Sequence, residues 1–203
     1  MKNIFILLAS LTLLSASCKK KTESHEAPKT AVVENTYQVS SKGSEVYWTG
    51  YKFTDKKGVK GKFKTIDVTN APVAKTQLEA LNGTEFSIPV SSVFSKNAAR
   101  DGKLATLFFG VMDQTEFLTG SFVTKGESLA LNLKMNGVTK QIPVAHKISD
   151  RHVKIDGVLK ISDFGAQGAL DSIHKACELL HTGKDGVSKT WDEVAVEAIV
   201  YLK

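Results

Sequence analysis

Apolar and polar residues alternate along most of the chain beyond residue 35. Apolar residues at every second position are typical of a β-strand with one buried face. We therefore expect nine strand-like runs, at 35–40, 44–53, 58–69, 83–90, 115–124, 127–135, 138–148, 152–162 and 192–202. The clearest alternation is that of Leu129, Leu131, Leu133 and Met135, repeated by Ile142, Val144, His146 and Ile148 and by Val194, Val196, Ala198, Val200 and Leu202.

Turn residues connect some of these runs directly. Asn136-Gly137 lies between two of them, and this pair most readily takes the two positive φ angles of a two-residue hairpin turn. Residues 127–148 should therefore fold back on themselves as an antiparallel pair. The pattern as a whole predicts an all-β chain, arranged as an antiparallel barrel or sandwich.

Two segments depart from the alternation. Residues 96–108 are compatible with a short helix, and residues 168–182 have apolar positions spaced by three and four, as in an amphipathic helix. These positions are Leu170, Ile173, Cys177 and Leu180.

Composition narrows the classes of protein. The 203 residues are 42% hydrophobic and 24% charged, which fits a globular domain. The two cysteines, Cys18 and Cys177, cannot supply a disulfide framework. The net charge of +6 is spread thinly and only two basic residues are arginines, so the clustered basic surface of a nucleic-acid-binding protein is missing.

The first residues predict a targeting segment. Residues 1–17 combine Lys2, an apolar stretch and a run of small residues, as a cleaved signal peptide does. Cys18 follows directly and resembles the processing site of a bacterial lipoprotein, where the thiol receives a diacylglycerol; the alternative is a cleaved soluble protein with Cys18 near its start. Residues 18–34 are then the lipidated cysteine and a flexible tether, and 35–203 the folded domain. We expect a lipid-anchored protein of the cell envelope, in the outer membrane facing the periplasm.

Several motifs follow one another in the folded part: Asn97 to Asp101 followed by Leu104 and Phe108-Phe109, the stretch Asn136 to Val144, and Asp156-Gly157 through Ser162 to Gly165. These motifs, in this order, resemble those of the YceI-like polyisoprenoid-binding family. The resemblance spans residues 36 to 203. It implies an extended, lipocalin-like antiparallel β-barrel of about eight strands, with one or two short helices, around an apolar channel for an isoprenoid chain such as a quinone or prenyl phosphate tail. The chain departs from the family pattern before Trp48, where a common histidine is missing, and at residues 166–190, which insert a helix.

A closed sheet of about eight strands is either filled by its side chains or holds one small ligand. Aromatic residues are the expected wall material, although each of them could equally be an ordinary core residue. The candidate lining residues are Trp48, Phe53, Phe63, Phe86, Phe108, Phe109, Phe117 and Phe122. Arg100 is a candidate for gripping an anionic head group such as pyrophosphate, the alternative being a surface ion pair with Asp101.

A second set of residues suggests metal chemistry. On one continuous helix His174, Cys177 and His181 would fall within about 60° of one another, and imidazole with thiolate can bind zinc or copper. The alternative is an amphipathic helix with a buried Cys177 and both histidines at the solvent boundary.

Enzymatic signatures are missing from the sequence. It has no Gly-x-Ser-x-Gly, no His-Glu-x-x-His, no Gly-rich phosphate loop and no Cys-x-x-Cys. We therefore interpret the chain as a non-enzymatic envelope lipid-binding protein that needs no cofactor or metal and holds an isoprenoid lipid, a quinone or a similar long apolar ligand. Its expected partners are this lipid and, through Cys18, a membrane, with a homodimer left open. The alternatives are a metal-binding or redox-partner protein using His174, Cys177 and His181, and an interaction protein whose barrel is only a scaffold.

Overall fold

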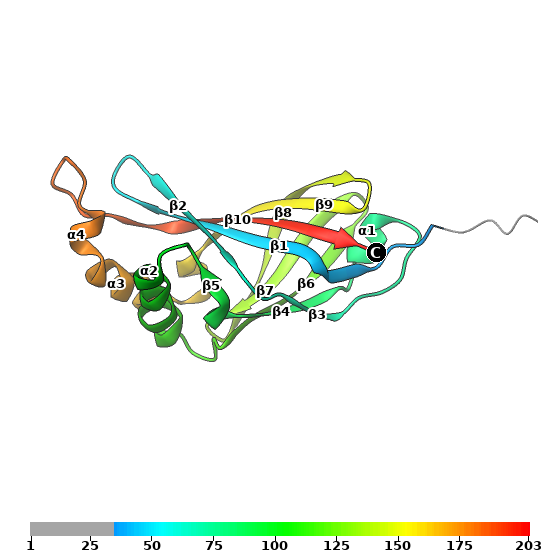
Figure 1. The fold of residues 1–203 in the computed structure, drawn as a ribbon, viewed down its shortest axis with the longest axis horizontal. Coiled ribbons are helices and arrows are strands. Elements are labelled where there is room, and N and C mark those ends of the chain that lie inside the picture. The colour runs from blue at the N-terminus through cyan, green and yellow to red at the C-terminus, as the bar shows by residue number, and fades with distance from the viewer. Residues whose placement is uncertain (1–34) are drawn as a thin grey trace, which may run out of the picture. The chain divides into compact units, whose positions relative to one another are not determined.

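The computed structural model describes residues 35–203, so the predicted signal peptide, the lipidation at Cys18 and the tether lie outside the described residues. In the described part ten antiparallel strands form one sheet, in the order β3-β4-β6-β7-β8-β9-β10-β1-β2-β5 (Figure 1). They are β1 Val39–Lys52, β2 Lys57–Phe63, β3 Asp67–Asn70, β4 Glu85–Pro89, β5 Val93–Phe94, β6 Phe117–Lys125, β7 Ser128–Met135, β8 Val138–Ser149, β9 His152–Lys160 and β10 Thr190–Leu202.

This sheet curls into a half-barrel with few short helices (Figure 1). The mostly β, antiparallel character is confirmed. The expectation of about eight strands in a closed barrel is wrong, because β3 and β5 are the two ends of the strand order and do not pair with each other. The run predicted at 58–69 is divided into β2 and β3, and the 3-10 turn Val90–Ser92 leads into the additional short strand β5.

The predicted hairpin at 127–148 is confirmed. Asn136 and Gly137 have φ angles of 52° and 70°, and Met135 pairs with Val138 across the two-residue turn between β7 and β8. Asn and Gly tolerate positive φ better than other residues, which is why this pair fixes the register of the two strands.

Four short helices lie at the two ends of the half-barrel (Figure 1). α2 Ala98–Lys103 and the π-helical turn Leu104–Phe108 confirm the helix expected at 96–108. The single helix predicted at 168–182 is instead two, α3 Gln167–Ala176 and α4 Glu178–His181, because the backbone leaves helical geometry at Cys177 (φ −120°, ψ 11°). Among the described residues no helix combines the length and hydrophobicity needed to cross a membrane.

α1 Gln77–Leu81 was not predicted, although the sequence carries a signal for it. Thr76 caps this helix by accepting a hydrogen bond from the backbone N–H of Glu79 at 3.2 Å, and Thr-x-x-Glu is a helix-start motif. Burial explains why so short a helix is stable, since Ala80 and Leu81 are completely buried.

The core consists of two clusters of buried side chains. The helix-side cluster includes Phe63, Phe109 and Phe164 and reaches α3. The α1-side cluster joins Leu81 to Val153 and Leu202 of the sheet, all three at 0% exposure. The end of the half-barrel next to α1 is therefore closed by packed side chains.

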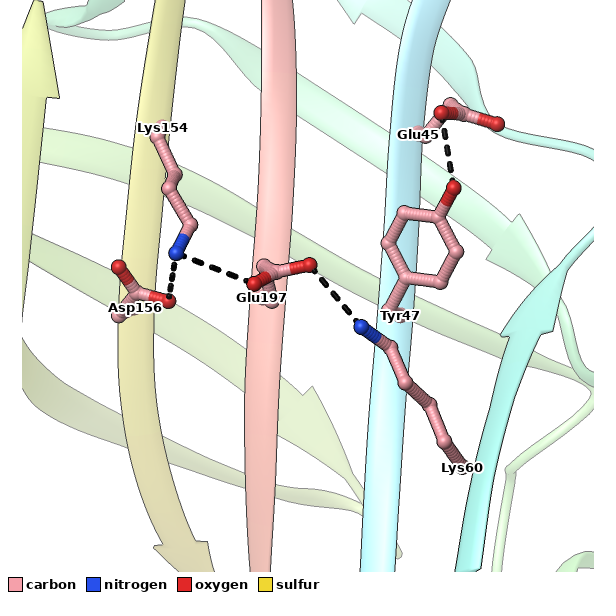
Figure 2. Close-up of polar contacts among 6 residues, drawn as sticks. All are labelled: Glu45, Tyr47, Lys60, Lys154, Asp156 and Glu197. Carbon is pink, nitrogen blue, oxygen red and sulfur yellow. Dashed lines mark hydrogen bonds and ion pairs between the residues drawn. The ribbon is translucent and has the colours of Figure 1, made fainter.

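The outer face of β9, β10, β1 and β2 carries ion pairs that cross the strands (Figure 2). Lys154 contacts Asp156 at 3.2 Å and Glu197 at 3.1 Å, and Glu197 also contacts Lys60 at 3.2 Å. Lys154 and Lys60 lower the pKa of Glu197 by donating hydrogen bonds to its carboxylate. These exposed contacts mark this face as the solvent side, so that the opposite face of the same strands lines the interior.

Candidate functional site

The curled sheet encloses a cavity of about 550 Å³. This volume lies within the range of about 300–1,000 Å³ of small-molecule sites. The lining side chains come mainly from the inward faces of the strands, because residues two apart on a strand share a face. Val194, Val196 and Ala198 of β10 illustrate this alternation. The half-barrel thus contains an elongated, mostly apolar chamber.

Most of the predicted wall residues line this chamber. They are Trp48, Phe63, Phe86, Phe108, Phe109 and Phe122, together with Arg100. Aromatic contacts connect several of them, with ring centroids 6.3 Å apart for Phe63 and Phe109 and 5.8 Å apart for Phe86 and Phe122.

Phe53 and Phe117 do not line the chamber. Phe53 lies in the β1–β2 turn with a φ angle of 62°, and the Nζ of Lys52 lies 4.4 Å from its ring centroid. Phe117 is 48% exposed on β6, on the face opposite to that of Phe122. The residue numbers of Phe117 and Phe122 differ by five. Residues of a regular strand share a face only when this difference is even, so the two side chains lie on opposite faces.

The chamber is closed at one end and polar at the other. At the α1 end, the lining residues Val39, Phe122 and Val200 belong to the α1-side cluster. At the opposite end the lining includes Lys52, Lys103 and other polar or exposed side chains. We call this polar end, formed by α2, α3, α4 and the ends of β1 and β10, the mouth.

Three cationic side chains line the mouth: Lys52, Arg100 and Lys103. Nζ of Lys52 donates to the carbonyl oxygen of Leu180 at 3.0 Å, and Nζ of Lys103 donates to that of Ala176 at 2.9 Å. None of the three forms an ion pair within the described part of the chain. Their charges are therefore available to a ligand.

The predicted alternative for Arg100, a surface pair with Asp101, does not form. Oδ1 of Asp101 instead accepts hydrogen bonds from the backbone N–H of Ser95 at 2.9 Å and from its hydroxyl at 2.5 Å. Asn97 caps α2 by accepting from the backbone N–H of Arg100 at 2.9 Å. These contacts fix the first turn of α2, which holds Arg100 in the cavity lining.

His174 and His181 meet at one hydroxyl group. Their Nδ1 atoms lie 3.0 Å and 2.6 Å from Oγ1 of Thr190. A hydroxyl has a single proton, so with both rings neutral it donates to one Nδ1 and accepts from the other. Burial lowers the pKa of His181 to about 4, followed by electrostatic interactions with Lys52, His174 and Lys103. His181 is therefore neutral at pH 7.

The predicted metal face does not assemble. The break at Cys177 places His181 on a separate helix from His174, so the three donors do not lie on one continuous helix. Within residues 35–203 no group of three or more His, Cys, Asp and Glu side chains is arranged to hold a metal ion. Cys177 is half-buried in the cavity lining, with its Sγ 3.9 Å from Nζ of Lys103.

Comparison with known proteins shows the family to which the chain belongs. The sequence model of the YceI-like domain family matches residues 37–200. This chain belongs to the YceI-like family. The sequence matches none of the curated proteins with which it was compared. The YceI-like family consists of binding proteins that are generally non-enzymatic.

Solved structures share the fold at low sequence identity. A polyisoprenoid binding domain from Saccharophagus degradans implicated in plant cell wall breakdown has a TM-score of 0.58 and 13% identity, covering 82% of this chain and 97% of that one. BcnA from Burkholderia cenocepacia has a TM-score of 0.53 and 17% identity, covering 81% and 99%. A mutant YceI protein from Campylobacter jejuni has a TM-score of 0.52 and 18% identity, covering 72% and 86%.

Sequence reasoning missed the small residues of this YceI-like cavity. Gly50 lines it, and a Cβ added there meets no atom within 4 Å. Gly61 faces Trp48 across the β1–β2 pair, and a Cβ there would lie only 2.2 Å from the indole, so the glycine allows the ring to lie flat on the sheet. Glycines inside predicted strands were the available signal, since they mark places where another group approaches the backbone.

Proposed function

We propose that this YceI-like protein binds the chain of an isoprenoid-type lipid inside its half-barrel and places the lipid's head group at the mouth. The observation that carries the proposal is the apolar chamber of about 550 Å³, closed at the α1 end and polar at the other. A polyisoprenoid binding domain of the same fold supports the choice of lipid class. Burial of hydrocarbon supplies the affinity, at roughly 0.8 kcal/mol per methylene.

The test uses a substitution that fills the cavity. Gly50 lies on the inward face of β1 with open space beside it, so Gly50→Trp should place an indole inside the chamber. Thr49→Trp is the matched control, because Thr49 lies on the opposite face of the same strand. We expect wild type and the control to retain a co-purifying apolar lipid in native mass spectrometry, and the plugged variant to lose it.

A binding titration makes the outcome quantitative. Delipidated wild type should bind a prenol such as farnesol, and Gly50→Trp should weaken that binding by about tenfold or more. Equal binding by the plugged variant, or no binding by wild type, would contradict the proposal.

We further propose that Arg100 holds an anionic head group, such as a prenyl pyrophosphate, because guanidinium can grip phosphate oxygens in pairs. Arg100→Glu should abolish a preference for farnesyl pyrophosphate over farnesol while leaving farnesol affinity unchanged. Lys96→Glu is the control, since Lys96 is a nearby basic residue that does not line the cavity. An unchanged preference in Arg100→Glu would instead favour an uncharged head group such as a quinone.

The proposed location is the cell envelope, with a lipid anchor on Cys18 in the outer membrane facing the periplasm. It is supported by the small residues before Cys18 and by the apolar stretch of the predicted signal peptide. Metabolic labelling with radioactive palmitate should mark the wild-type chain and not Cys18→Ser. Labelling of both chains, or of neither, would remove this assignment.

A further inference from the structure

Two segments form the outermost part of the mouth, and we call them together the tip. They are the β1–β2 turn Lys52–Lys57 and the stretch Glu178–Trp191, which lie at the same end of the half-barrel (Figure 1). Hydrogen bonds connect them: Phe53 N–H to the Lys189 carbonyl at 3.1 Å, Trp191 Nε1–H to the Phe53 carbonyl at 2.7 Å, the Thr54 hydroxyl to Asp185 at 2.5 Å, and Lys52 Nζ to the Leu180 carbonyl at 3.0 Å. The two segments of the tip are thus held together by direct hydrogen bonds.

Large apolar side chains of the tip face solvent. Leu179 is 90% exposed, Leu180 is 61% exposed and Val187 is 48% exposed. Leu180 also lines the cavity, whereas Leu179 does not. Adjacent exposed leucines at the mouth of an apolar cavity point to a partner that is itself apolar.

Lysines and aromatic residues surround these leucines in the two segments. The tip contains five lysines against three acidic residues. Nζ of Lys189 lies 4.1 Å and that of Lys56 lies 4.9 Å from the Trp191 ring centroid. Trp with Lys is the combination that membrane interfaces favour, because the ring sits at the head groups and the ammonium meets lipid phosphates.

Protein contacts neutralise one lysine of the tip. Lys56 pairs with Glu193, which lies just beyond the tip, while Asp185 of the tip accepts from Thr54 and from the backbone N–H of Val187. By contrast, Lys184 and Lys189 form no ion pair within residues 35–203. Five lysines against three acidic residues leave the tip with a positive formal charge even after Lys56 pairs with Glu193, and this charge complements anionic lipid.

We propose that the tip docks on the surface of a lipid bilayer containing anionic lipids, with Leu179 and Leu180 inserted among the head groups and the mouth facing the membrane. Docking in this orientation would let a lipid pass between bilayer and cavity without crossing water. The passage of lipid rests on the proposed function, but docking does not.

The test measures vesicle binding by flotation. Both core clusters and all ten strands lie within residues 35–203, which belong to one compact unit, so these residues are the protein used. The vesicles are phosphatidylcholine alone, or phosphatidylcholine with phosphatidylglycerol. Wild type should float only with the anionic vesicles. Leu179→Asp and Lys184→Glu should each lower its partition coefficient by about fivefold or more.

Matched controls carry the same chemical changes at the other end of the half-barrel. Val73, 63% exposed beside α1, is changed to Asp, and Lys125, the last residue of β6, is changed to Glu. Both should float like wild type, and circular dichroism melting verifies that every variant is folded. Farnesol binding in vesicle-free solution should be unchanged in Leu179→Asp, which separates docking from the cavity.

Three results would overturn the proposal. Wild type could fail to float with anionic vesicles, it could float equally with uncharged ones, or the tip variants could float as well as the controls. A wild-type dimer in light scattering that Leu179→Asp converts to a monomer, without vesicle binding, would assign the leucines to self-association instead. Loss of farnesol binding with intact flotation would refute the proposed function and leave docking standing.

Discussion

Thr190 is the residue at which the polar contacts of the mouth converge. Its one hydroxyl serves both His174 and His181, and the neutral state of His181 depends on burial and on nearby lysines. A proton added to His181 would enter a partly buried site already surrounded by positive charge. The mouth is therefore sensitive to acid.

This sensitivity predicts how stability depends on pH. The folded-state pKa of His181, about 4, lies below its unfolded value of 6.5, so between these values the unfolded chain binds the extra proton and stability falls as the pH falls. Because the ring is only half-buried, we discount the effect to about 1–2 kcal/mol of unfolding free energy between about pH 7 and pH 4. Urea unfolding across this range measures it.

The control for this pH effect is a second histidine. His181→Gln should flatten the acidic slope, whereas His152→Gln, at an exposed position on β9, should keep it. An identical slope in His181→Gln and wild type would show that His181 does not titrate as inferred.

At Gly61 the Trp48 ring leaves no space for a larger residue. A Cβ at this position would lie 2.2 Å and 2.5 Å from two carbons of the Trp48 indole. Gly61→Ala should therefore displace a cavity-lining ring and destabilise the fold by about 1–3 kcal/mol, with weaker prenol binding. Gly168→Ala in α3 meets no atom within 4 Å and should be neutral or slightly stabilising. Thermal melting compares the two, and equal melting temperatures would contradict the packing argument.

Strand β10 shows what periodicity can and cannot predict. Its alternation was readable, and Val194, Val196 and Ala198 do line the cavity. The same rule would have excluded Phe117, because it differs in parity from Phe122, but an argument from aromatic character alone does not use parity. The break at Cys177 was not readable, since the apolar spacing of the sequence continues through it from Ile173 to Leu180.

Position along β10 translates into depth in the cavity. Val194 pairs with Gly50 toward the mouth, and Ala198 pairs with Val46 farther toward the closed end. Ala198→Trp should therefore shorten the chamber. The affinity for a long prenol such as solanesol should fall by about tenfold, and the affinity for farnesol should be unchanged.

Ala195→Trp provides the control for this change. Ala195 lies on the outer face of β10 and pairs with Thr49, so its indole should leave both affinities unchanged. Competition between the two prenols for delipidated protein measures the ratio of affinities. An equal loss of affinity for both prenols in Ala198→Trp would show that position along β10 does not determine the length of chain that the cavity accepts.

The whole sheet depends on pairings that local pattern does not encode. Hairpins such as β7–β8 follow from a turn, but β1 pairs with β10, more than a hundred residues away, and no local signal specifies that contact. The strand count failed for the same reason, because short strands such as β5 are defined only by their partner. The resemblance to the YceI-like family supplied what periodicity could not, namely that the sheet curls around a chamber.

That chamber links stability to occupancy. An apolar chamber of about 550 Å³ without a ligand lacks the dispersion contacts that a hydrocarbon chain would make with its wall. A ligand at a hundredfold excess over its Kd should add about 2.7 kcal/mol and raise Tm by about 5–10 °C.

Calorimetry with the plugged variant tests this link between cavity and stability. Delipidated wild type should melt at a higher temperature when solanesol is added. Delipidated Gly50→Trp should melt above delipidated wild type, because its indole occupies apolar space beside β1, and solanesol should not raise its Tm further. Thr49→Trp should follow wild type in both states. If Gly50→Trp melted lower and still gained from solanesol, the indole would lie outside the chamber, and filling the chamber would not be the source of stability.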